Sequence, residues 1–378
     1  MKKVAVVFGT RPEAIKMAPV VAALRASPTL EPFVVSTGQH REMLKQVVDL
    51  FDISIDRELD VMRPNQNLAG LTARLIEAID DVLTVEKPAL VLAQGDTTTV
   101  LTAALASFYH NLPFGHVEAG LRTGNLRAPF PEEANRVLAG KLTTLHFAPT
   151  AWARDKLLAE QVPAEQIYVT GNTGIDAQRL ELARQQRPEV ARGLAAALDP
   201  LLPASWRTGR MVLITGHRRE SFGDGFLQIC SAIRALADRY ADVQFVYPVH
   251  LNPNVRGPVH ELLSNVANIH LLAPLPYSEF LALLAACTLV LTDSGGVQEE
   301  APGLGKPVLV MRDTTERPEG VAAGTAKLVG ARRDQIIGAV AQLLDDGAAR
   351  TAMMQAHNPY GDGHAAEQIV AACERFLG

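Results

Sequence analysis

The chain has 378 residues, 48% of them hydrophobic and 20% charged, a composition typical of a globular protein long enough for two domains. Its 36 Lys and Arg residues against 41 Asp and Glu residues give a formal net charge of -5, so no global basic field favours nucleic acid or an anionic membrane as a partner. Any anionic ligand must therefore be bound by local basic groups.

Cysteine usage and the N-terminal segment indicate a reducing compartment, which we expect to be the cytoplasm. The cysteines, Cys230, Cys287 and Cys373, are far apart and form no CxxC pair, so neither a disulfide framework nor a metal site is predicted. The start, MKKVAVVFGTRPEA, has the lysines and apolar run of a signal peptide, but polar residues interrupt it from Gly9 onward. No apolar stretch reaches the roughly 18 residues of a membrane span.

Short apolar runs that end in turn residues recur in the first half of the chain, between stretches such as 12–26 and 66–86 that have helical spacing. The runs are VAVVFGT, FVVSTGQH, LVLAQGD, FGHVEAG and IYVTGN. A continuous apolar run bounded by turn residues is typical of a strand buried on both faces. The alternation predicts a parallel sheet wrapped by helices.

The same alternation starts again in the second half, after a stretch without strand character at 183–210 that we interpret as a short helix with a linker. The second series is MVLITGHRRE, VQFVYPVH, NIHLLAP, LVLTDSGG and PVLVMRD. The fold class predicted is therefore α/β, with two doubly wound, Rossmann-like domains. Because open α/β sheets bind ligands at the carboxyl ends of their strands, we expect the domains to face a central cleft.

Most polar residues suited to chemistry fall at the ends of predicted strands. They are Arg11, Asp96, Glu118, His217, His250, Asp293 and Arg312. For any one of them, a strand-terminal cap or a solvated turn is an equally good explanation. Their shared placement favours a ligand site.

The segment LTDSGGVQEEAP gives the strongest signal for phosphate binding. A predicted strand delivers Ser294, Gly295 and Gly296 to a helix start, where glycines let a phosphate approach the backbone N–H groups and the helix dipole favours its charge. Glu300, about one turn further, suits ribose hydroxyls. The alternatives are a turn that uses glycine only for packing and an ordinary surface glutamate. Since neither GxxxxGK[ST] nor GxGxxG is present, a nicotinamide cofactor is disfavoured and no cofactor is expected.

Basic residues gather at the same strand ends, although the chain is net acidic. Arg11 follows the first predicted strand, and Lys16 lies near the start of the next helix, where it opposes the helix dipole unless an anion is bound. The segments GHRRES and RDTTERPEG supply the others, namely His217, Arg218, Arg219, Arg312 and Arg317. A local anion site explains this clustering better than chance.

Three carboxylates on adjacent β–α loops form a candidate proton-transfer site, since such a site needs one group to accept and another to donate. Asp96 precedes a Thr run, and the alternative role for it is to cap the next helix. Glu118 follows a buried strand, where a charge is partly desolvated. Glu132 follows Pro131 and begins a helix, where the dipole also favours an acid.

Together these motifs resemble the non-hydrolysing UDP-N-acetylglucosamine 2-epimerases of bacteria. The matching segments run in order along almost the whole chain: FGTRPEAIKMAP, QHREML, GDTTT, GHVEAGLRTG, PEEANR, TGNT, GHRRESFG, YPVHLNP, LTDSGGVQEEAP, GKPVLVMRDTTERPE and NPYGDG. In one departure, some members of the family carry Gln where Leu275 aligns. A contact made there through the backbone would survive that change.

The resemblance implies a GT-B fold in which the C-terminal helix returns to the first domain. We therefore expect an N-terminal domain of 1–172 with 364–378, and a UDP-binding domain of 173–363. It also implies reversible conversion of UDP-GlcNAc to UDP-ManNAc for surface polysaccharides. The implied assembly is a homodimer. Helix faces rich in Leu and Ala around 68–83 and 98–108 are candidates for its interface, and core packing explains these faces equally well. The charge balance predicts no nucleic-acid or membrane partner.

The resemblance also implies roles for individual residues. The catalytic residues implied are Asp96, Glu118, Glu132 and His217, the last beside the diphosphate. The implied UDP ligands are Arg11, Lys16, His217, Leu275, Phe280, Ser294, Gly295, Gly296, Glu300 and Arg317. A regulatory substrate site beside the active site would use Gln39, Arg218 and His250.

The chemistry of the implied reaction requires UDP to leave. The C2 proton of an N-acetylhexosamine is not beside a carbonyl, so its abstraction alone gives no stabilised carbanion, and oxidation at C3 would need NAD. Expulsion of UDP from C1 as a base takes the C2 proton gives a 2-acetamidoglucal, and re-addition with proton delivery to the other face inverts C2. A hydrolysing epimerase, a GT-B glycosyltransferase and a non-catalytic nucleotide-sugar sensor are the competing functions.

Overall fold

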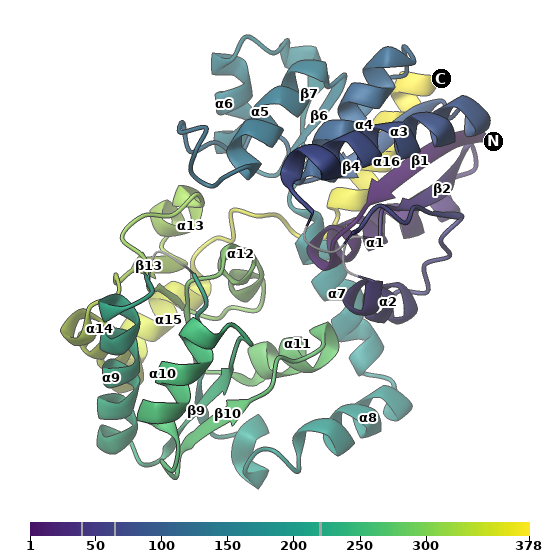
Figure 1. The fold of residues 1–378 in the computed structure, drawn as a ribbon. Coiled ribbons are helices and arrows are strands. Elements are labelled where there is room, and N and C mark those ends of the chain that lie inside the picture. Colours follow the sequence, from purple (N-terminus) through teal and green to yellow (C-terminus); the bar gives the residue numbers. More distant parts are fainter. Residues whose placement is uncertain (39–40, 64–65, 219–220) are drawn as a thin grey trace. The chain divides into compact units, whose positions relative to one another are not determined.

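The computed structural model describes residues 1–38, 41–63, 66–218 and 221–378 (Figure 1). Contacts divide the chain into two compact units. Unit 1 comprises Met1–Ala177 and Tyr360–Gly378, and unit 2 comprises Gln178–Pro359.

Unit 1 is built on a sheet in which every strand pair is parallel. Across the described part of the unit, the order is β3-β2-β1-β4-β5-β6-β7. The strands are β1 (Lys2–Phe8), β2 (Leu30–Ser36), β3 (Arg57–Glu58), β4 (Leu90–Gln94), β5 (Phe114–Val117), β6 (Leu145–Ala148) and β7 (Ile167–Val169). The side chains of β4, β5 and β6 are buried throughout, as expected for strands covered on both faces.

Helices cover both faces of this sheet. They are α1 (Arg11–Ala26), α2 (Arg41–Leu50), α3 (Leu68–Glu86), α4 (Thr98–Tyr109), α5 (Glu132–Leu142), α6 (Ala151–Ala159), the 3-10 turn η1 (Ala164–Gln166) and α16 (Ala365–Leu377). Residues of α3, α4 and α5 share one apolar core with β1, β4 and β5, and α16 packs against α1 (Figure 1). The C-terminal helix therefore belongs to unit 1.

Unit 2 repeats the same topology. Within its described residues the parallel sheet has the order β10-β9-β8-β11-β12-β13. The strands are β8 (Arg210–Thr215), β9 (Val243–Pro248), β10 (Ile269–Leu272), β11 (Leu289–Thr292), β12 (Val308–Val310) and β13 (Ala326–Leu328). In both sheets the strand order reverses beside the first strand, at β1/β4 and at β8/β11, and open α/β sheets bind ligands at such switch points.

The helices of unit 2 include those that carry the candidate ligand residues. They are the C-terminal part of α7 (Thr173–Gln185), α8 (Pro188–Leu198), η2 (Ala204–Arg207), α9 (Asp224–Arg239), α10 (Pro253–Leu263), α11 (Tyr277–Ala286), α12 (Gly295–Gly303), α13 (Pro318–Ala323), α14 (Arg333–Asp345) and α15 (Gly347–Gln355). Helices α9, α10 and α14 share the main apolar core of the unit (Figure 1). The stretch 183–210 holds α8 and η2, in line with a short helix plus linker.

The predicted α/β class with two doubly wound, Rossmann-like domains is confirmed. The sequence patterns missed β3, β6 and β13, since these strands have only two to four residues and show little periodicity. The boundary between the units lies inside α7, after Ala177, a few residues beyond the predicted limit at 172. Its first turn stays with unit 1 because the Asp176 carboxylate accepts the Ala366 N–H at 2.8 Å.

No helix in the described ranges is both long enough and apolar enough to cross a membrane.

Candidate active site

Glu118 occupies the turn directly after β5, in a backbone conformation that is rare for its residue type. Its φ is 68°, in the left-handed region, and its side chain is 8% exposed. Gly120 closes the turn, with φ 93° and a Cα so near α6 that an added Cβ would lie 2.3 Å from the Ala153 carbonyl oxygen. The β5–α6 packing therefore dictates where Glu118 lies, and left-handed non-glycine residues of this kind concentrate at functional sites.

Two side chains from other segments orient the Glu118 carboxylate. The Lys16 ammonium, on α1, forms an ion pair with Glu118 Oε2, and the Asn172 amide donates to the same oxygen at 3.5 Å. Asn172 is held by its own backbone N–H, which donates to the Tyr360 carbonyl, and by Gly174, which donates to its side-chain oxygen. The anion that accounts for a lysine near the start of α1 is thus a carboxylate of the chain itself.

Asp96, after β4, is paired with a buried arginine. Arg136 Nη2 lies 2.9 Å from Asp96 Oδ2, and the Asn135 amide donates to the Asp96 carbonyl at 2.9 Å. The N-cap of α4 is Thr97, so the alternative role of Asp96 as the helix cap is wrong. Both partners come from α5, and they hold Asp96 half-buried at the sheet edge.

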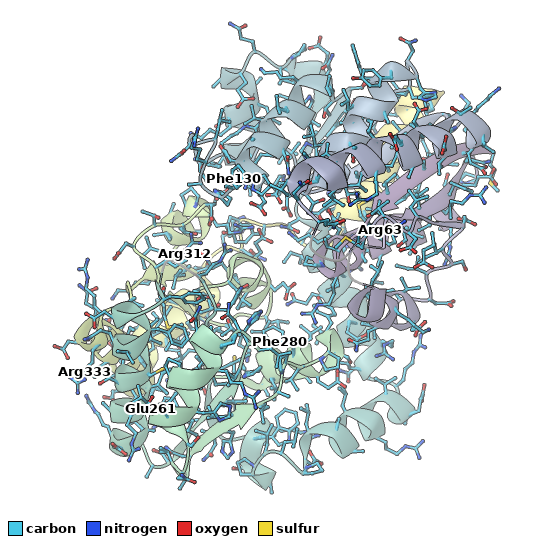
Figure 2. All side chains as sticks on the ribbon, viewed as in Figure 1. Arg63, Phe130, Glu261, Phe280, Arg312 and Arg333 are labelled. Atoms are coloured by element: carbon cyan, nitrogen blue, oxygen red, sulfur yellow. The ribbon has the colours of Figure 1, made fainter. Side chains whose placement is uncertain are left out.

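The structure separates the two adjacent glutamates that begin α5. Glu133 is 1% exposed, and its Oε1 accepts the backbone N–H groups of Thr123 and Gly124 at 2.9 and 3.0 Å. Glu132 is only half-buried, and its carboxylate contacts no polar partner among the residues that the structure describes. Glu133 therefore holds the preceding loop, and Glu132 is the one available for chemistry. That loop exposes Phe130 near its C-terminal end (Figure 2).

Glu13, which the motif reasoning passed over, organises the switch point between β1 and β4. Its Oε2 accepts the N–H groups of Gly9 and Thr10, both at 2.8 Å, and its Oε1 accepts the Thr97 hydroxyl. Burial raises the pKa of the Glu13 carboxyl, although these hydrogen bonds act in the opposite direction. The TRPE capping-box pattern was the available signal. Glu13 sets the turn from which Arg11 begins α1.

Two buried histidines lie behind the carboxylates, on paired positions of β5 and β6. His116 Nε2 lies 2.7 Å from the Gly95 carbonyl, and His146 is its neighbour in the register. Burial lowers the pKa of His116 to about 3 and that of His146 to about 4. Both rings are therefore neutral near pH 7, and His116 stabilises the turn that carries Asp96.

In unit 2, the start of α12 has the features of an anion site. Ser294 is its N-cap but makes no side-chain capping hydrogen bond, so its own side chain does not satisfy the first N–H groups of the helix. Gly295 allows the Arg317 guanidinium to lie against the backbone, since an added Cβ would come within 2.7 Å of Arg317 Cζ. At Gly296 an added Cβ would meet nothing within 4 Å, which leaves room for a phosphate.

Buried carboxylates orient the arginines of this region. Arg317 Nε donates to Glu299 Oε1 at 2.7 Å, and Arg312 binds Glu316 through both terminal nitrogens, at 2.8 and 3.3 Å. Burial alone would raise the pKa of Glu316, but Arg312 and Arg317 hold it at about 2. Figure 2 labels Arg312, which follows β12.

His217 follows β8, next to Asp293, which follows the neighbouring strand β11. Its Nδ1 lies 3.3 Å from Asp293 Oδ1, and its ring stacks on His250 with centroids 5.3 Å apart. Arg218 donates its backbone N–H to Asp293 at 2.8 Å. The structure thus brings together His217, predicted to lie beside the diphosphate, with Arg218 and His250, predicted to bind a regulatory substrate molecule.

The other predicted UDP ligands of unit 2 are Leu275, Phe280 and Glu300. Leu275 is half-buried in the β10–α11 loop, and Phe280 is half-buried in α11 (Figure 2). The Glu300 carbonyl accepts the Gln178 amide at 2.9 Å, which holds α12 against α7. Gln39 lies outside the described residues. The described part of the chain contains no group of three or more His, Cys, Asp or Glu side chains arranged to hold a metal ion.

Comparison with known proteins shows which family this chain belongs to. Residues 22–374 match the family model described as UDP-N-acetylglucosamine 2-epimerase. The UDP-N-acetylglucosamine 2-epimerases of Yersinia pestis and of Escherichia coli K12 are 54% and 52% identical to this chain, over 98% of each protein.

Solved structures agree. A UDP-GlcNAc 2-epimerase from Neisseria meningitidis, bound to UDP-GlcNAc, is 48% identical with a TM-score of 0.93, over 99% of this chain and 100% of that one. The enzyme from Methanocaldococcus jannaschii, in complex with UDP-GlcNAc and UDP, is 32% identical with a TM-score of 0.84, over 99% of each chain.

Proposed function

The chain belongs to the UDP-N-acetylglucosamine 2-epimerase family, and we propose that it interconverts UDP-GlcNAc and UDP-ManNAc reversibly, without hydrolysing them. The observation that carries this proposal is the Glu118 site. A buried carboxylate in a left-handed turn, aimed by Lys16 and Asn172, has the constraint expected of a proton-transfer group.

The first half of the proposed reaction is an elimination. A carboxylate of unit 1 takes the C2 proton, the C2–H electron pair forms the C1=C2 double bond, and the C1–O bond breaks with its electrons leaving on the β-phosphate of UDP. The products are a 2-acetamidoglucal and UDP. The step needs no oxidant, because the sugar is neither oxidised nor reduced overall.

The departing diphosphate gains negative charge, and the residues of unit 2 are suited to stabilise it. The first N–H groups of α12 after Ser294, the Arg317 guanidinium and the His217 ring supply donors and positive charge. We assign the uridine to the region of Leu275 and Phe280 and the ribose to Glu300, with Arg11 and Lys16 as further ligands. Their placement at the ends of parallel strands supports this assignment.

The second half reverses the elimination with opposite stereochemistry. A β-phosphate oxygen attacks C1, and a carboxylic acid on the other face returns a proton to C2. Inversion therefore needs acids on two sides of the sugar, and unit 1 offers Glu118, Asp96 and Glu132. Asp96 and Glu118 each have a cationic partner, whereas Glu132 has none in the described part of the chain.

Two further properties belong to this proposal. We propose that the enzyme is a homodimer, which exposed apolar side chains on two adjacent helices, Leu68 on α3 and Phe108 on α4, support. We also propose that Arg218 and His250 bind a regulatory substrate molecule, which the position of both residues beside His217 supports. Sedimentation and the dependence of rate on UDP-GlcNAc concentration test these points.

Incubation with UDP-GlcNAc in heavy water, followed by NMR at C2, tests the reaction itself. We expect UDP-ManNAc with deuterium at C2, approaching an equilibrium mixture without added cofactor. Accumulation of free ManNAc and UDP would instead identify a hydrolysing epimerase, in which water adds to the glucal. If C2 of neither sugar exchanges, both epimerase mechanisms are wrong.

A further inference from the structure

Asp293 is completely buried, and its two carboxylate oxygens have different environments. Oδ2 accepts the backbone N–H groups of His217 and Arg218, at 2.7 and 2.8 Å. These two hydrogen bonds join the end of β11 to the turn after β8, so the fold itself accounts for Oδ2. Burial alone would raise the pKa of Asp293, but the His217 ring and these N–H groups lower it.

The fold does not account for Oδ1. It is buried and makes no standard hydrogen bond within the described residues, and the polar group facing it is His217 Nδ1, at 3.3 Å. A buried carboxylate oxygen without a donor is energetically costly. The His217 ring is therefore the group that Oδ1 is placed to meet, and hydrogen bonds of this kind are often long until a ligand binds.

A second histidine fixes the plane of the His217 ring. His250 stacks on it with an interplanar angle of 18°, and His250 Nδ1 accepts the Asn252 N–H at 3.1 Å. An imidazole nitrogen that accepts a hydrogen bond carries no proton, so His250 is neutral. Burial, and then the nearby His217, lower the pKa of His250.

We propose that Asp293 is a positioning residue that keeps the Nδ1 proton of His217 facing Oδ1, so that Nε2 is the ring atom presented to the ligand. When the ring is doubly protonated, Asp293 compensates its charge and Nε2–H donates to the departing diphosphate. The identity of that ligand rests on the proposed function. The tautomer of the ring does not.

The tautomer is measured directly on the full-length protein without substrate. Nitrogen-15 NMR with labelled histidine, at about pH 8.5 so that an ordinary histidine is neutral, distinguishes protonated Nδ1 from protonated Nε2. A His217→Asn sample assigns the signal. We expect the Nδ1–H form in the wild type, and a wild-type ring in the Nε2–H form overturns the proposal, whatever the variants do.

Asp293→Asn sharpens the test because the amide oxygen can still accept both backbone N–H groups while its NH2 group faces the ring. We expect His217 to change to the Nε2–H tautomer, and kcat for epimerisation to fall about 100-fold, within the usual range for general acid–base groups. The dissociation constant of UDP should rise less than tenfold. An unchanged tautomer in a folded Asp293→Asn variant contradicts the proposal.

Tyr247→Phe is the matched control for loosening of the same turn. The Tyr247 hydroxyl donates to the Gly216 carbonyl at 2.9 Å, one residue before His217. We expect this variant to keep the Nδ1–H tautomer and most of kcat. If it lost kcat as Asp293→Asn does, mechanical support of the turn rather than the tautomer would explain the effect. If the wild type shows no C2 exchange, the proposed function fails, and the NMR result still decides the role of Asp293.

Discussion

The two units use the same sheet order but opposite arrangements of charge. In unit 1 the proposed working groups are carboxylates held by cations: Glu118 by Lys16, and Asp96 by Arg136. In unit 2 the proposed working groups are basic side chains held by carboxylates: His217 by Asp293, and Arg317 by Glu299. The shared strand order therefore does not determine the chemistry of a unit. The side chains at the carboxyl ends of its strands determine which charge the unit presents.

In most of these pairs the supporting partner is the more deeply buried one. Side-chain exposure is 6% for Arg136 against 30% for Asp96, and 0% for Asp293 against 40% for His217. A buried charge is tolerated only when it is paired. Each buried partner therefore restricts the orientation of the exposed group, which is the preorganisation that catalysis requires.

The largest effect is expected from removing the working charge of unit 1. Glu118→Gln keeps the shape of the side chain but cannot accept a proton, so we expect kcat to fall about 10³-fold, within the range for acid–base groups. UDP binding, measured by calorimetry, should largely persist because most of the residues that we propose as diphosphate ligands lie in unit 2. Retained turnover would show that Glu118 is not part of the mechanism, and the proposed contrast between carboxylates in unit 1 and basic groups in unit 2 would then be wrong.

A matched glycine pair tests how the turn at Glu118 is set. In Gly120→Ala the new Cβ would meet the backbone of Ala153, so we expect the free energy of unfolding to fall by about 3 kcal/mol, together with activity. Gly124 also has a positive φ, 79°, but an added Cβ meets nothing within 4 Å, so Gly124→Ala should cost only about 1 kcal/mol. Equal losses in urea denaturation would show that the Ala153 contact is unimportant.

Acid should destabilise β5 and β6, in unit 1, before the segment after β12, in unit 2. The folded-state pKa of His116, about 3, lies below the ordinary value near 6.5, so its contribution is complete above pH 6.5 and is lost as pH falls toward 3, by up to about 1.4 kcal/mol per pH unit. Glu316, with a folded-state pKa of about 2, loses its contribution only between about pH 4.5 and 2. At pH 5, hydrogen exchange in β5 and β6 should therefore increase before that in β12.

His116→Gln checks the source of this difference. The amide can still donate to the Gly95 carbonyl but does not titrate, so the variant should lose up to about 2 kcal/mol less stability than the wild type between pH 7 and pH 5. Glu13 acts with the opposite sign, because a raised pKa lets the folded chain bind a proton first. An unaltered pH profile in the variant would assign the acid sensitivity to other groups.

The smallest effect is expected at the proposed anion site of unit 2. In Gly295→Ala the new Cβ meets the Arg317 guanidinium, which can move aside, so folding should be retained while UDP binds about fivefold more weakly, roughly 1 kcal/mol. Gly338→Ala, in α14, adds a methyl group that meets nothing within 4 Å and serves as the control. Unchanged UDP affinity in Gly295→Ala would separate Arg317 from the diphosphate.

The sequence alone determined the alternation of strands and helices, the two repeats of the fold, and the polar residues at the strand ends. These features are local, because burial on both faces makes a strand continuously apolar, and residues such as Ser or Pro mark a helix start. The helix starts after β11 and at Glu132 could be predicted because Ser294 and Pro131 precede them.

Only the tertiary structure decided which charges meet. Lys16 and Glu118 are 102 residues apart, and His217 and Asp293 are 76 apart. His217 and Asp293 follow the neighbouring strands β8 and β11, whereas Lys16, on the helix after β1, reaches Glu118 after β5, two strands away. It also decided that Glu133 supports a loop while Glu132 stays available, although the two are adjacent in sequence. Pairing follows the order of strands in the sheet, in which β4 lies between β1 and β5, and no local pattern along the chain encodes that order.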